Sequence, residues 1–225
     1  MAASETPGAR FARIGLWLIP VYGALLAVGT ITHQPDYDTD FRGYAEYITT
    51  DRFLVSHLGA SVAGAALGLL GIVAALAFLA RGRAATPAIL GAACFIVGNV
   101  LFTALFGVAA FAQPGIGEAF LAGTPGMREL NDDVYGTPLF ATAGTGFLFF
   151  VAGAILLGIA IARHSRPLKW IGIGFASTLV LFVVGFLMLE IAQPIGGALF
   201  ALVGIALALR LPDQATLGAP GTRQA

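Results

Sequence analysis

Five polar side chains stand at the ends of long apolar segments, where they could bind a ligand or move a proton: His33, His57, Gln113, Glu190 and Gln193. Histidine changes its charge near neutral pH and is a common metal ligand. An ionisable group such as Glu190, placed in an otherwise apolar run, is costly at membrane depth and is treated by default as functional. We therefore expect these five residues to line one polar pocket.

His33 and His57 flank the first polar loop and are the candidate ligands of a divalent metal or a haem. The alternative is that each ring bonds to a backbone carbonyl or a loop carboxylate. The chain has neither an H-x-x-x-H nor an H-E-x-x-H spacing, which favours this alternative. The sequence indicates no other cofactor, and it leaves a haem or a divalent metal open.

His57 should face other helices rather than lipid. It shares one helical face with small residues at intervals of three and four positions, and such residues let helices approach closely: Ser61, Gly64, Gly68 and Gly71.

Two polar loops carry further acids, with Asp36 and Asp38 in the first and Asp132 and Asp133 in the second. The alternation of Asp36, Asp38 and Asp40 is superficially like a calcium-binding loop, but Phe41 stands where such a loop needs glycine. We expect solvated loops with short helices at 44–50 and 127–133.

The composition identifies the class of protein that positions these residues. Of 225 residues 58% are apolar and only 11% charged, where a soluble domain has about a quarter. A helix crosses a bilayer with about 20 apolar residues. Six segments satisfy this requirement, and we predict an all-α polytopic membrane protein with spans at 14–32, 54–80, 86–112, 138–162, 168–191 and 195–211. The flanks 1–13 and 212–225 are expected to be tails, the second of them disordered.

The charges are sorted along the chain although their sum is zero. With both termini in the cytoplasm, nine of the twelve Lys and Arg residues lie inside: Arg10, Arg13, Arg81, Arg83, Arg163, Arg166, Lys169, Arg210 and Arg223. Ten of the twelve acids then lie outside or at the outer edge. The positive-inside rule therefore predicts a cell-membrane protein with cytoplasmic termini and acidic outer loops.

An internal repeat relates the two halves of the chain. An offset of about 80 residues pairs Arg83 with Arg163, Pro87 with Pro167, and Ala112-Gln113-Pro114 with Ala192-Gln193-Pro194. Gln34-Pro35 adds a third copy of the dipeptide. We predict three tandem helical hairpins in which each odd helix ends at Gln-Pro, because proline disfavours helix at the residue before it.

Three functions remain open from the sequence. The first is binding or transport of a small ligand, ion or lipid through an outward-facing polar pocket. The second is an enzyme acting on a lipid or isoprenoid, with Glu190, Asp132 or Asp133 as general acid and His57 as base. The third is a structural or regulatory subunit. Membrane lipids are the expected surroundings. The glycine-rich faces are compatible with a membrane-protein partner or with a second copy of the chain. The zero net charge gives no electrostatic support for binding to nucleic acid.

Overall fold

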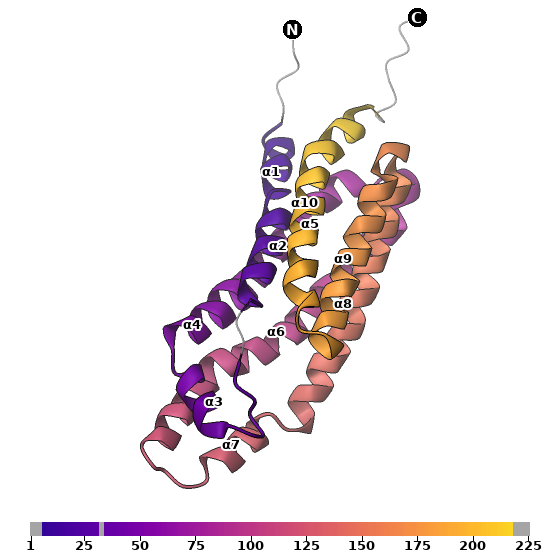
Figure 1. The fold of residues 1–225 in the computed structure, drawn as a ribbon. Coiled ribbons are helices and arrows are strands. Elements are labelled where there is room, and N and C mark those ends of the chain that lie inside the picture. Colours follow the sequence, from indigo (N-terminus) through magenta and orange to yellow (C-terminus); the bar gives the residue numbers. More distant parts are fainter. Residues whose placement is uncertain (1–5, 32–33, 218–225) are drawn as a thin grey trace, which may run out of the picture.

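The computed structural model describes residues 6–31 and 34–217, with the backbone alone for 214–217. This part of the chain is all-helical and contains no strand. Its main helices are α1 (Pro7–Gly15), α2 (Leu18–Gly29), α3 (Phe41–Ile48), α4 (Asp51–Leu54), α5 (Gly64–Leu79), α6 (Ala85–Leu121), α7 (Met127–Val134), α8 (Thr137–His164), α9 (Lys169–Met188) and α10 (Ala192–Leu217). Figure 1 shows that α1 begins and α10 ends at one end of the bundle, while α3 and α7 gather at the other.

Six helical segments of the described chain are long and apolar enough to cross a membrane: Pro7–Gly29, Asp51–Leu79, Gly82–Leu121, Met127–His164, Arg166–Met188 and Ala192–Asp213. This confirms the all-α membrane class and the number of predicted spans. Large apolar side chains point away from the bundle, as lipid-facing residues do; Phe111, Leu148 and Trp170 are each about three-quarters exposed.

The first span is broken, and its helix begins earlier than predicted. α1 ends at Gly15 and α2 begins at Leu18. Pro20 explains the break, because it has no N–H to donate and its ring clashes sterically with the carbonyl of Leu16, four residues before it. The helix begins at Pro7 behind the capping residue Thr6, so most of the predicted tail 1–13 is helical.

The prediction that the third span ends at Gln113-Pro114 is wrong. α6 continues through Pro114 to Leu121. The extension is held by packing on α3: the rings of Phe120 and Phe41 meet edge to face at 4.6 Å. A Cβ on Gly117 would lie 2.9 Å from Ile48 Cγ1, so the two helices touch closely. This packing offsets the backbone hydrogen bond that proline cannot make.

The other two Gln-Pro copies also do not end helices. α9 ends at Met188, and Gln193-Pro194 lies in the first turn of α10, where an N–H has no helical partner to lose. Gln34-Pro35 lies beyond the end of α2 at Gly29. The prediction that each odd helix ends at Gln-Pro is therefore wrong, and the tandem-hairpin relation itself stays a prediction. α10 continues to Leu217, so residues 212–217 of the predicted disordered tail are helical.

The helix that carries His57 is widened at its start. Residues Val55–Ala63 form a π-helix between α4 and α5. The carbonyl of Phe53 accepts hydrogen bonds from Ser56 Oγ at 2.8 Å and from His57 Nδ1 at 2.9 Å. In an α-helix this carbonyl would accept a hydrogen bond from a backbone N–H, whereas here it accepts from two side chains. Short π-helical turns are frequent at functional sites.

The spans form a closed bundle in which α2, α10, α9, α8, α6 and α5 each contact the next. α6 and α8 approach most closely at glycines. A Cβ on Gly98 would lie 2.3 Å from the backbone nitrogen of Phe150, and one on Gly153 would lie 2.4 Å from that of Phe95. The core of the bundle contains fully buried aromatic rings from four helices, namely Phe95 of α6, Phe150 of α8, Phe175 of α9 and Phe200 of α10.

Candidate functional site

A cap made of α3, α7 and the loop before α3 covers the end of the bundle away from the termini (Figure 1). α3 is amphipathic: Phe41, Tyr44, Ala45 and Ile48 are buried, whereas Arg42 and Glu46 are exposed and form an ion pair at 3.2 Å. Asp40 caps the helix by accepting a hydrogen bond from the N–H of Gly43 at 2.8 Å. The helix predicted at 44–50 therefore lies at 41–48, and the one predicted at 127–133 is confirmed as α7.

A first cavity under this cap has a volume of about 460 Å³. It lies between the cap and the bundle, and its wall combines aromatic rings with a few polar groups. Its lining residues include Gln34, Tyr37, Tyr44, His57, Phe106, Gln113, Asn131, Asp132, Tyr135 and Phe186.

The second cavity, of about 480 Å³, shares residues with the first. Gln34, His57, Phe106 and Phe186 line both, so the two cavities adjoin. Thr30, Asp36, Ser61, Glu190 and Gln193 line the second cavity but not the first. Of the five predicted pocket residues, the structure thus brings together His57, Gln113, Glu190 and Gln193, while His33 lies outside the described residues.

His57 stands where the two cavities meet, and one of its ring nitrogens is already engaged. Its Nδ1 lies 2.9 Å from the carbonyl oxygen of Phe53 and 3.0 Å from Ser56 Oγ. Because a carbonyl oxygen can only accept, Nδ1 carries the proton, and Nε2 of the neutral ring keeps its lone pair. This arrangement leaves Nε2 to accept a hydrogen bond or ligate a metal.

Gln113 joins the bundle to the cap. Its Nε2 donates to the hydroxyl of Tyr44, and both side chains are buried. Burial, with a smaller contribution from the neighbouring Tyr37, raises the pKa of Tyr44 above its ordinary value of about 10. Tyr44 therefore remains a neutral hydroxyl.

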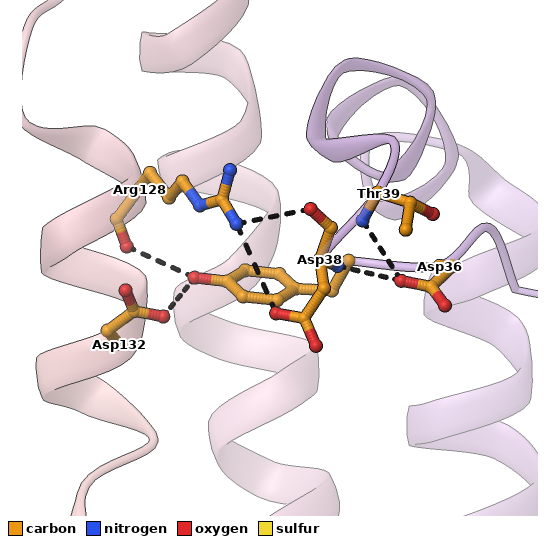
Figure 2. A network of polar contacts seen from close by, with 6 residues as sticks. Asp36, Asp38, Thr39, Arg128 and Asp132 are labelled. Atoms are coloured by element: carbon orange, nitrogen blue, oxygen red, sulfur yellow. Dashed lines mark hydrogen bonds and ion pairs between the residues drawn. The ribbon is translucent and has the colours of Figure 1, made fainter.

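Tyr37 joins the first loop to α7. Its hydroxyl donates to the carboxylate of Asp132, and burial followed by this bond raises the pKa of Tyr37. Arg128, also on α7, lies over the ring of Tyr37 at 5.4 Å and donates from Nη2 to the carbonyl of Asp38 at 3.3 Å. Figure 2 shows Arg128 and Asp132 side by side against the loop that holds Asp36 and Asp38.

The loop acids have different surroundings. Asp36 Oδ1 accepts from the backbone N–H groups of Thr39 at 3.1 Å and Asp38 at 2.8 Å, and these bonds lower the pKa of Asp36 (Figure 2). The carboxylate of Asp38 lies 4.0 Å from Arg128. All three of Asp36, Asp132 and Asp133 are exposed, but Asp132 lines the first cavity and Asp36 the second, whereas Asp133 lines neither.

The sequence predicted Glu190 within the fifth span at 168–191, but in the structure it lies outside that helix. α9 ends at Met188, and Glu190 is an exposed residue of the turn before α10, where its carbonyl accepts from the N–H of Gln193 at 3.1 Å. The helix stops early because α9 and α10 meet tightly here; a Cβ on Gly185 would lie 2.6 Å from the nitrogen of Gln193. Glu190 therefore reaches the second cavity from the turn.

No group of three or more His, Cys, Asp or Glu side chains is placed to hold a metal ion within residues 6–31 and 34–217. The metal hypothesis for His33 and His57 depends on His33, which is not among them. His57 alone is placed in the cavity wall.

Several lining residues were not among the five predicted for the pocket: Tyr37, Tyr44, Asn131 and Tyr135, and also Gln34. The sequence offered one signal, because Gln34 belongs to the same Gln-Pro repeat as Gln113 and Gln193, and all three line the joined cavities. The spacing of the tyrosines gave no such signal, because nothing in it says that α3 and α7 fold over the bundle.

Asn99 makes the interhelical contact expected of an amide in mid-span. Its Oδ1 accepts from the hydroxyl of Tyr22 on α2 at 3.3 Å, and both residues are buried.

Comparison of the chain with protein-family models, with curated proteins and with solved structures gives no match.

Proposed function

We propose that this integral membrane protein binds a small ligand in the joined cavities under the cap. The observation that carries the proposal is the position of His57, which lines both cavities and keeps its Nε2 lone pair while Nδ1 is held by Phe53. Pockets for small molecules are mostly apolar, of about 300–1,000 Å³, with a few convergent polar groups. Each cavity falls in this range and combines phenylalanine rings with amide, hydroxyl and carboxylate groups.

The pocket opens toward the outer side of a cell membrane in this proposal. The argument is the distribution of charge: the cap carries acids such as Asp36, Asp38 and Asp132, whereas Arg81, Arg83 and Arg163 lie at the connections of the opposite end. Basic residues concentrate on the cytoplasmic side of membrane proteins. The ligand would then enter from outside, and transport would need a further conformational step.

The test is purification in lipid nanodiscs followed by native mass spectrometry of whatever stays bound. We expect a small molecule in the native protein and its loss in His57→Ala, because the variant removes a group shared by both cavities. His164→Ala is the matched control, since His164 ends α8 away from the cap. Retention of the same molecule by His57→Ala, or a native protein free of any small molecule across several lipid compositions, would refute the proposal.

A further inference from the structure

The wall of the first cavity is unusually rich in aromatic rings. Six surround it, from the first loop, α3, α6, the turn after α7, α8 and α9: Tyr37, Tyr44, Phe106, Tyr135, Phe140 and Phe186. An aromatic face carries negative charge density and attracts a cation that lies over it. A cavity walled by several such faces favours a positively charged group that has lost its water.

The charged side chains that line the two cavities are all carboxylates: Asp132 in the first, Asp36 and Glu190 in the second. Neither lysine nor arginine lines either cavity in the described part of the chain. The nearby Arg128 is directed to Asp38 and to the rings of Tyr37 and Phe41. The electrostatic potential in the cavities therefore favours a cation over an anion.

Asn131, beside Asp132 on α7, is a buried polar residue of the cavity wall. It is 4% exposed and lines the first cavity, and its Oδ1 is buried without a hydrogen-bond partner. Asn131 therefore adds a neutral polar side chain, and no positive charge, to the wall beside Asp132.

Arg128, which does not line the cavity, makes cation–π contacts with one of its rings, Tyr37, and with the neighbouring Phe41. Its guanidinium carbon lies 5.4 Å from the ring centre of Tyr37 and 5.7 Å from that of Phe41. Both distances are within the range of a cation–π contact.

From these observations we infer that the ligand is a protonated organic amine with an apolar body. Its ammonium N–H groups donate to Asp132 among the aromatic rings, and its apolar part lies against Leu105, Ala109 and Phe140. This inference rests on the proposed function, because it assigns a chemical class to the ligand of the same cavity.

Three probes of one shape test the inference: 2-phenylethylamine, its neutral isostere 2-phenylethanol, and phenethyltrimethylammonium, which is charged but has no N–H. Binding is measured by saturation-transfer NMR on the protein in nanodiscs, with empty nanodiscs of the same lipids subtracted. We expect the amine to bind roughly tenfold tighter than the alcohol, since charge-assisted hydrogen bonds and cation–π contacts act on the amine. The trimethylammonium probe should bind with intermediate affinity.

Two variants locate the cation. Asp132→Asn should weaken the amine by roughly tenfold and leave the alcohol unchanged, because it removes one charge and keeps the shape. Asp133→Asn is the matched control, being the adjacent acid that lines neither cavity.

The outcomes separate this inference from the proposed function. Equal binding of amine and alcohol by the native protein would overturn the amine assignment while the cavity still binds a ligand. Equal effects of Asp132→Asn and Asp133→Asn would overturn it as well. If no probe binds and no molecule is retained on purification, the proposed function itself fails. Should Asp132→Asn not fold, the comparison of probes on the native protein still decides.

Discussion

Gln113 of α6 donates a hydrogen bond to the hydroxyl of Tyr44 of α3, and this buried contact ties the cap to the bundle. The two residues lie 69 positions apart in the chain. Because α6 continues past Pro114, Gln113 points into the space beneath α3 rather than ending a helix. Through this hydrogen bond the amide of Gln113 has a structural role at the edge of the proposed ligand cavity.

Breaking this contact should destabilise the protein. Gln113→Leu and Tyr44→Phe are each expected to lower the free energy of unfolding by about 1–3 kcal/mol, because each leaves a buried polar partner unsatisfied. The double variant should lose less than the sum of the two, which a thermodynamic cycle in detergent measures. Tyr47→Phe, on the same helix, is the control and should change little. Strictly additive losses would mean that the two side chains do not interact.

The close contact of α6 with α8 predicts opposite effects at two glycines of one helix. Gly98→Ala should lower the free energy of unfolding by about 1–3 kcal/mol, because its Cβ would lie 2.3 Å from the nitrogen of Phe150. Gly107→Ala meets nothing within 4 Å and should raise it by up to about 1 kcal/mol through helix propensity. Thermal unfolding of both variants in the same detergent makes the comparison. Equal stability of the pair would contradict the packing of these helices.

The two proline contexts also predict opposite signs. Pro114→Ala should raise the free energy of unfolding by up to about 3 kcal/mol, because the new N–H can bond within α6. Pro194→Ala, in the first turn of α10, gains no such bond and should lower it by up to about 1 kcal/mol, because proline restricts the unfolded chain. Thermal unfolding measures both. A loss on Pro114→Ala would show that the proline shapes α6 for its contact with α3.

The proposed sidedness predicts which end of the bundle reacts from outside the cell. In a Cys94→Ala background, Ala122→Cys near the cap should be labelled by a membrane-impermeant maleimide on intact cells. Thr86→Cys, at the opposite end, should be labelled only after the membrane is permeabilised. Both native residues are exposed, so access rather than burial decides the result. Labelling of Thr86→Cys alone on intact cells would reverse the orientation.

The turn built on Asp36 predicts a dependence of stability on pH. Backbone N–H groups of Thr39 and Asp38 lower the pKa of Asp36 in the folded protein. Its ionised form therefore stabilises the fold above the unfolded pKa of about 3.9, and this contribution is lost as the pH falls through the folded pKa. The difference in melting temperature between the native protein and Asp36→Asn should be constant above about pH 5 and shrink below about pH 4. A difference that stays constant down to pH 3 would exclude the charge of Asp36 as its cause.

The sequence alone determined the membrane class and the six spans, because their length and apolar content are local properties that a bilayer requires. It also indicated that His57, Gln113, Glu190 and Gln193 belong to one end of the bundle. The sequence did not correctly predict where helices end relative to proline. The same Gln-Pro dipeptide lies inside α6, in the first turn of α10 and beyond the end of α2. It is tolerated inside α6 because packing on α3 outweighs the cost of Pro114.

Only the tertiary structure decided what surrounds the site. Tyr37, Tyr44, Asn131 and Tyr135 come from two short helices and their flanking turns, far apart in the chain and close together only where the cap folds onto α6. Local periodicity states which face of each short helix is apolar, but the partner of that face depends on contacts between residues far apart in the sequence. For that reason the placement of the aromatic wall beside Asp132, which carries the amine inference, appears only in three dimensions.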